Sequence, residues 1–182
     1  MQECLEERKG RMYRAEEMVV YGQNGVCRVV EVCHSPFDRN DERLFYVLRP
    51  EINTDKSTIF VPVETAEDKM RLPMTKAEAE ALLASIPEIG PLTVEIEKAR
   101  RDTYRRALVG AAPRDYVAIL KAVVIRRKEA LLAKRQLAGA DAEYEQKART
   151  FLALELAMAL GENAREMAAR LSEEISGVPA GV

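Results

Sequence analysis

The sequence predicts an α+β protein in which β-strands occupy the first part of the chain and α-helices the rest. Two pairs of short runs, within residues 18–33 and 44–63, have the β-branched and aromatic composition that is typical of strands. After Pro73 the apolar residues recur with the helical period of 3.6. The chain of 182 residues can hold one large domain or two small ones.

The first pair of strands has a strong turn signal. Residues 18–21 and 26–33 flank Asn24-Gly25, and Asn-Gly is favoured in tight hairpin turns because both residues tolerate positive φ. In the second of these strands both alternating sets of side chains are mostly apolar, as in a strand that is covered on both faces. Residues 1–15 are polar and mixed in charge, and we treat them as an extension without an assigned function.

The second pair of strands, residues 44–48 and 58–63, forms a hairpin whose polar loop carries Asn53, Asp55 and Ser57. The period of two places Phe60 and Pro62 on the face opposite to the aliphatic residues Ile59, Val61 and Val63. Four strands are enough for a small SH3-like or Tudor-like barrel of about 60 residues.

Pro62 indicates that the last of these strands lies at an edge, because proline has no N–H to donate to a neighbouring strand. An outward aromatic ring such as Phe60 on an open edge can anchor the strand of a partner protein. The ring can equally pack under a loop or helix of its own chain.

The second part of the chain contains a capping box, Thr75 with Glu78, at the start of its first helix. A long amphipathic helix from Arg114 to Gly139 follows, and we expect it to bury Val117, Leu120, Val124 and Leu131 and to expose Lys121, Arg127 and Lys128. Residues 141–160 are nearly all apolar from Phe151 onward, so they predict the central helix of a bundle.

Charge is distributed unevenly along the chain. The net charge is −2, but residues 93–136 carry twelve Lys and Arg against five acids, a local charge of +7. Such a segment is typical either of a solvated helix face or of a surface that contacts nucleic acid.

Other classes of function have little support in the sequence. The three cysteines are few and odd in number, as expected in a reducing compartment, and neither they nor the single histidine can be assembled into a metal site or a catalytic arrangement. The glycines are scattered and match no phosphate-binding loop, so we expect a protein that is not an enzyme and needs no cofactor. No apolar run has the length of a membrane span, so we expect the protein to be cytoplasmic.

Several short segments, in order along the chain, carry a resemblance to a known family: Met-Val-Val-Tyr at 18–21, Asn-Gly-Val at 24–26, Phe-Tyr-Val-Leu-Arg at 45–49, Ile-Phe-Val-Pro-Val at 59–63, Arg71-Leu72, and Lys-Ala-Arg at 147–149 with Glu155-Leu156. From residue 18 to about residue 160 the chain resembles the CarD/CdnL family of bacterial transcription regulators. The resemblance implies a Tudor-like RNA-polymerase-interacting domain, shared with the transcription-repair coupling factor, that docks on the β subunit. It also implies a helical domain that touches promoter DNA near the upstream edge of the melted region and stabilises the open complex.

These implications define the domains and the partners that we expect. Residues 1–15 form the extension, 16–72 the polymerase-interacting domain and 73–182 the helical domain that contacts DNA. The expected partners are the polymerase β subunit and promoter DNA, and the protein is expected to be a monomer that reaches the nucleoid through polymerase. The alternative is an adaptor between proteins that has the same barrel and no direct DNA contact.

Candidate site residues follow from the resemblance and from the basic segment. The expected polymerase-binding residues are Arg49, Thr58, Ile59, Phe60, Val61 and Pro62. The expected DNA-binding residues are Lys98, Arg100, Arg101, Tyr104, Arg105, Lys121, Arg127 and Lys128. The family inserts a tryptophan into DNA near the start of the first basic helix, but this sequence has no tryptophan, and the matching position falls at or near Arg100. A guanidinium can pair with phosphate or enter a narrow minor groove but is a poor wedge between bases.

Overall fold

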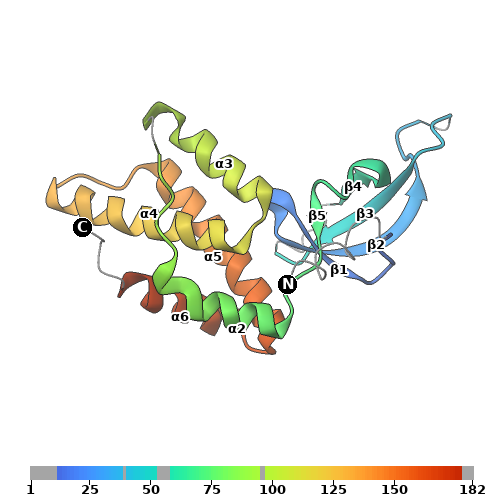
Figure 1. Cartoon of the computed structure of the whole chain (residues 1–182). Helices are drawn as coiled ribbons and strands as arrows, with labels where there is room; N and C mark the ends of the chain where they lie inside the picture. Colours follow the sequence, from blue (N-terminus) through green and yellow to red (C-terminus); the bar gives the residue numbers. More distant parts are fainter. Residues whose placement is uncertain (1–11, 39, 53–57, 95–96, 178–182) are drawn as a thin grey trace. The chain divides into compact units, whose positions relative to one another are not determined.

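The computed structural model describes residues 12–38, 40–52, 58–94 and 97–177. The loop residues Asn53, Asp55 and Ser57 and most of the extension 1–15 lie outside the described residues. The chain divides into two compact units, Met1–Pro73 and Met74–Val182, called unit 1 and unit 2 below (Figure 1). Strands lie in unit 1 and the α-helices in unit 2, which confirms the predicted α+β class.

Unit 1 is built on a five-stranded antiparallel sheet in the order β4-β3-β2-β1-β5. The strands are β1 (Met18–Tyr21), β2 (Val26–His34), β3 (Leu44–Pro50), β4 (Ile59–Pro62) and β5 (Met70–Arg71). The four strands expected from the sequence are present, and the two-residue β5 is an addition. Among the described residues the sheet does not close on itself, so β4 and β5 are its two edges.

One face of the sheet carries the core of unit 1. Tyr46 lies opposite Val61 and Leu48 opposite Ile59, so alternate side chains of β3 and β4 meet on that face. Tyr13, which precedes β1, closes the cluster: its ring centroid is 5.6 Å from that of Tyr46, and its main-chain N–H donates a 3.0 Å hydrogen bond to the Tyr46 hydroxyl. The other buried members are Val19, Cys27, Val29, Ala66 and Met70.

A bulge in β2 explains why both sets of its side chains are apolar. Val29 lies opposite Leu48 and Glu31 opposite Val47, so Val30 is the extra residue. Such an insertion shifts the alternation of side chains by one position. Cys27 and Val29 before the bulge and Val32 after it therefore all pack on the same core.

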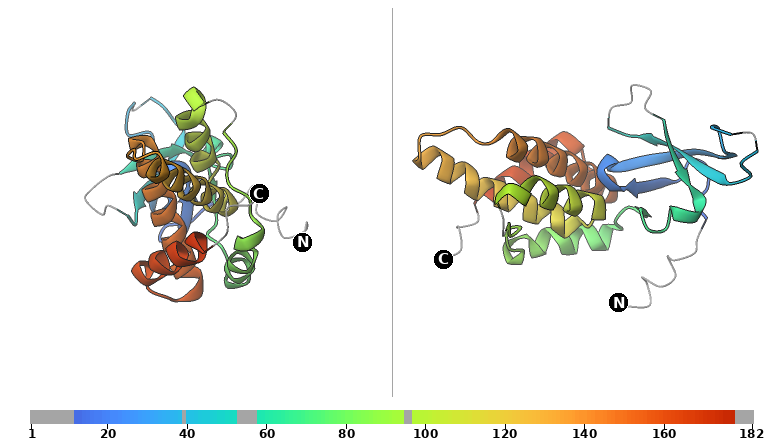
Figure 2. Two further views of the ribbon diagram at one scale, coloured as in Figure 1. Left: turned by 90° about the vertical axis from the view of Figure 1, so that its left-hand side faces the viewer. Right: turned by 90° about the horizontal axis from the view of Figure 1, so that it is seen from above.

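Unit 2 is a bundle of helices (Figure 2). The described α-helices are α2 (Lys76–Ser85), α3 (Arg100–Gly110), α4 (Pro113–Leu132), α5 (Gly139–Leu160) and α6 (Ala164–Ser176). Helix α5 contacts the other four, which confirms its predicted central place. The capping box is also confirmed: the Glu78 carboxylate accepts the Thr75 N–H at 2.7 Å, and the Thr75 hydroxyl accepts the Glu78 N–H at 3.3 Å. None of the described helices has the length and apolar character needed to cross a membrane.

The second half of α4 differs from the sequence expectation. The helix ends at Leu132, and Gly139 begins α5 rather than ending α4. The fully buried positions of α4 stop at Val123. The predicted burial of Leu131 is therefore wrong, and its side chain is 76% exposed.

Candidate functional site

The edge strand β4 is the first candidate surface. In the described sheet it is hydrogen-bonded only to β3, which confirms the edge position predicted from Pro62. Phe60 lies opposite Val47 and Pro62 opposite Phe45, so these four side chains share the face opposite the core cluster, and on that face Phe45 and Val47 are buried as well. The strand therefore combines an open main-chain edge with an aromatic residue directed away from the core.

The ring of Phe60 is half-buried, since it packs against one residue of the loop between β2 and β3. Phe37 meets Phe60 edge to face with ring centroids 5.4 Å apart, and it meets Phe45 at 6.1 Å. Phe37 itself is 74% exposed. A loop of its own chain thus covers one side of the ring, and the expected contact of Phe60 with a partner stays a prediction. We call Phe37 and Phe60 the aromatic pair.

Arg43 also contacts Phe45 and adds a positive charge next to the aromatic pair. Its guanidinium carbon lies 5.9 Å from the centroid of the Phe45 ring, within the range of a cation–π contact. Asp41 holds the guanidinium through a 2.7 Å hydrogen bond. This bond lowers the pKa of the Asp41 carboxyl to about 2. The sequence did not single out Phe37 and Arg43, because their proximity to β4 depends on the path of the loop.

The other residues expected at the polymerase contact have different environments. Thr58 and Arg49 are exposed, Ile59 and Pro62 are half-buried, and Val61 is buried in the core. Val61 can therefore contribute only its main chain to a partner. Arg49 lies opposite Arg28, whose guanidinium is bound by Glu16 and Glu51, each at 3.1 Å. Within the described part of the chain, Arg49 itself has no ion-pair partner.

Comparison with protein families identifies unit 1. Residues 13–74 match the family model described as CarD-like/TRCF RID domain. Unit 1 is a CarD-like/TRCF RID domain. The RID domain has a Tudor-like fold and belongs to a class of domains that interact with RNA polymerase. No curated protein shows significant similarity to the chain. The open edge β4 and the aromatic pair therefore lie within the part of the chain that carries the family match.

The second candidate surface, the basic helices of unit 2, requires three corrections. The predicted exposure of Lys121 is wrong: its ammonium is buried and donates hydrogen bonds to the carbonyls of Ile86 and Ile89, both at 2.5 Å, and of Pro87 at 3.3 Å. Tyr104 is also fully buried, and this burial raises the pKa of its hydroxyl to about 12. Neither side chain can touch DNA in this structure.

Arg100, the residue at the family's wedge position, is the third correction. Its guanidinium forms a 3.0 Å ion pair with Asp141 of α5, and only 15% of its side chain is exposed. The sequence could not reveal this pair, because Asp141 lies outside the basic segment and 41 residues away. Arg100 thus joins α3 to α5 rather than presenting its charge to a ligand.

The remaining basic side chains are exposed but partly neutralised. Arg101 pairs with Glu143 at 3.2 Å, Arg105 with Asp102 at 2.5 Å, and Arg127 with Glu145. Arg101 and Lys147 together lower the pKa of Glu143. Lys98 and Lys128 are exposed and have no ion-pair partner among the described residues. Acids of α5 therefore reduce the charge that residues 93–136 present to solvent.

The described residues contain no cluster of three His, Cys, Asp or Glu side chains that could hold a metal ion. Burial raises the pKa of the Cys27 thiol to about 12, so this cysteine is not a nucleophile at neutral pH.

Proposed function

We propose that this protein is a transcription regulator that binds the β subunit of RNA polymerase through β4 of its RID domain. The observation that carries the proposal is the combination of an open edge strand with the aromatic pair on the outer face. In β-strand addition the partner forms main-chain hydrogen bonds with the free edge, and side chains on one face provide specificity.

Main-chain groups and side chains of unit 1 have different roles in the proposed contact. At the edge, β4 can offer the main-chain groups of those alternate residues that do not bond to β3, and Pro62 has no N–H to offer. Phe60 and Phe37 provide the apolar area, since aromatic residues are enriched among the residues that dominate binding energy. Arg49 and Thr58 are exposed next to Ile59, the first residue of β4, where they can pair with polar groups of the partner.

A binding comparison with a β-subunit fragment tests this half of the proposal. Phe60→Ala is expected to weaken binding at least about tenfold, equivalent to about 1.4 kcal/mol. Leu44→Ala is the matched control, because it truncates an exposed apolar residue on the opposite face of β3 and should leave binding unchanged. Equal binding by wild type and Phe60→Ala would exclude the aromatic anchor.

We further propose that unit 2 holds promoter DNA near the melted region and stabilises the open complex. The exposed cations Lys98, Arg101, Arg105 and Lys128 support this part. Arg127 of α4 is also exposed, but Glu145 binds its guanidinium. Without a tryptophan the contact is expected to rest on phosphates, so it should be strongly salt-dependent.

The lifetime of open complexes tests the DNA contact. Arg101→Glu with Arg105→Glu should shorten the lifetime and reduce its dependence on salt concentration. Arg165→Glu, on the exposed side of α6, makes the same kind of charge reversal at one position outside the basic segment and serves as the control.

The adaptor without DNA contact is a second candidate, and one observation favours it. Burial of Lys121 and the pairing of Arg100 with Asp141 leave a smaller cationic surface than the sequence implies. DNA footprints of polymerase with and without the protein separate the two candidates, because an adaptor adds no DNA protection.

A further inference from the structure

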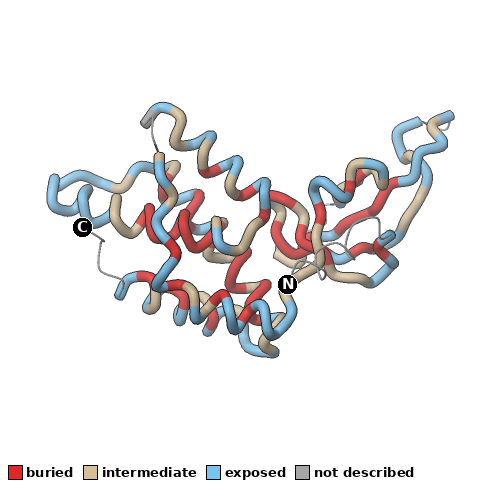
Figure 3. The backbone as a smooth tube through the Cα atoms, viewed as in Figure 1, coloured by how far each residue is buried: buried red, intermediate tan, exposed pale blue. Residues whose placement is uncertain are grey.

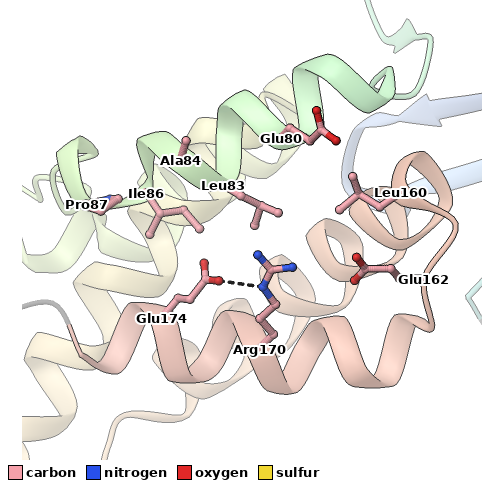
Figure 4. Close-up of a pocket in the computed structure, with 9 residues that line it drawn as sticks. All are labelled: Glu80, Leu83, Ala84, Ile86, Pro87, Leu160, Glu162, Arg170 and Glu174. Carbon is pink, nitrogen blue, oxygen red and sulfur yellow. Dashed lines mark hydrogen bonds and ion pairs between the residues drawn. The ribbon is translucent and has the colours of Figure 1, made fainter.

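Unit 2 contains a groove of about 650 Å³ between α2 and α6. Leu83, Ile86, Pro87 and Leu160 are among its lining residues and supply its larger apolar side chains (Figure 4). Nothing in the proposed contacts with polymerase or DNA uses this groove. Its shape and lining are those of a surface that receives apolar side chains.

The groove is bordered by acids. Glu80, Glu162 and Glu174 line it together with Arg170, whose guanidinium points across the groove towards α2 and forms a 2.8 Å ion pair with Glu174 (Figure 4). Residues 76–88 and 162–176, which build this side of unit 2, contain seven acids and three bases. An occupant that matches the groove therefore combines apolar side chains with positive charge.

The end of α4 has this combination of properties. Leu131 and Leu132 are 76% and 85% exposed, the two most exposed of the large hydrophobic side chains in the described residues. Residues 126–136 contain five bases and one acid, and Lys134 and Arg135 follow the two leucines after Ala133. Figure 3 shows this end of the helix as almost entirely exposed. We call Leu131, Leu132, Lys134 and Arg135 the α4–α5 tip.

We propose that the α4–α5 tip of one copy of this chain docks in the α2/α6 groove of a second copy. The leucines cover the apolar lining residues, and the cations of the tip face the acids of the rim. Tip and groove are different surfaces, so the contact is heterologous, and a pair of copies still has one free tip and one free groove. The contact is small, so association is weak and is further weakened by salt. This inference differs from the monomer expected from the sequence.

Sedimentation of the full chain, freed of nucleic acid, tests the self-association. At concentrations up to about 1 mM and low salt, the average mass of the wild type should rise above the 20.4 kDa of one copy, and it should fall again at about 0.5 M salt. A mass that stays at one copy throughout would overturn the proposal.

Two variants test the α4–α5 tip and the α2/α6 groove separately. Leu131→Glu with Leu132→Glu removes the tip, and Ala84→Arg places bulk and positive charge in the groove at an exposed position. Each variant alone should remain at one copy. Val109→Glu and Ala81→Arg are the matched controls, because both positions are exposed and lie outside the tip and the groove lining; they should associate like wild type.

A mixture of the two variants provides the decisive measurement. The tip variant retains an intact groove and the groove variant an intact tip, so a 1:1 mixture should form dimers and nothing larger. A mixture that stays monomeric while the wild type associates would overturn the proposed pairing, as would unchanged association of either variant alone. Binding to the polymerase β subunit should be unaffected in both variants, since it depends on unit 1.

Discussion

Phe37 and Phe60 meet edge to face with their ring centroids 5.4 Å apart, although 23 residues separate them in the chain. The contact joins the loop between β2 and β3 to the edge strand β4, on the face away from the core. It leaves Phe60 half-buried and Phe37 largely exposed. The proposed docking surface is therefore a pair of rings and not a single aromatic side chain.

Phe37→Ala should consequently reduce polymerase binding with little effect on folding. Because the ring is mostly exposed, its loss should change the free energy of unfolding by less than about 1 kcal/mol. Binding to the β-subunit fragment should weaken several-fold, since the partner loses aromatic contact area. Calorimetric titration and chemical denaturation measure the two effects. Unchanged affinity would restrict the anchor to Phe60.

Lys121→Met should destabilise unit 2 strongly. The variant keeps the apolar stem but removes the ammonium that donates to three main-chain carbonyls just after α2. Buried acceptors without a donor cost roughly 2–4 kcal/mol in total. Denaturant unfolding measures the loss, and Lys128→Met, at an exposed position of the same helix, is the control. Equal stability of the two variants would contradict the structural role of Lys121.

Glu155 provides a third test, because its buried carboxylate accepts the main-chain N–H of Met74 at 2.9 Å. Glu155→Gln retains an oxygen acceptor of similar shape, whereas Glu155→Leu leaves the N–H without one. The leucine variant should lose more stability than the glutamine variant, by roughly 1–3 kcal/mol. Hydrogen exchange at the Met74 amide should accelerate mainly in the leucine variant. The same exchange rate in both would show that the bond does not protect this amide.

The titration of Asp41 is a fourth test. Its pKa in the folded protein is about 2, below the ordinary value of 3.8, because Arg43 donates hydrogen bonds to the carboxylate. The folded pKa is the lower one, so the stabilisation is present above the unfolded value and is lost as the pH falls from about 4 to about 2. An NMR titration of the Asp41 carboxyl group should give a pKa of about 2 in the wild type and a higher pKa in Arg43→Gln. An unchanged value in that variant would exclude the guanidinium as the cause.

The sequence predicted the strand part of the fold well, because local signals decide it. Pro62 predicted an edge strand, and the alternation of side chains along β4 predicted that Val61 rather than Phe60 faces the core; the edge position and the burial of Val61 are confirmed. The bulge at Val30 was not predicted, since an apolar extra residue does not interrupt the apolar pattern. The loop that brings Phe37 to Phe60 could not be predicted either, because its path depends on contacts distant in sequence.

Long polar side chains in the helices were the main source of wrong predictions. Helical spacing places Lys121 on a particular face, but it does not show that carbonyls more than 30 residues earlier will accept its hydrogen bonds. Arg100 was misjudged for the same reason, since its partner Asp141 belongs to a different helix. Leu131 fits the apolar spacing of α4, yet the fully buried positions of that helix end before it.

The shortness of β4 also bears on solubility. Any sheet with a free border can grow by adding identical chains, and long flat borders of this kind are sites of fibril formation. Here the border is only four residues long and ends in Pro62, which lacks an N–H. Few main-chain hydrogen bonds can form along so short an edge, so copies of the sheet should not join edge to edge into a continuous sheet. For the same reason, side chains must contribute much of the binding energy of a partner strand at this edge.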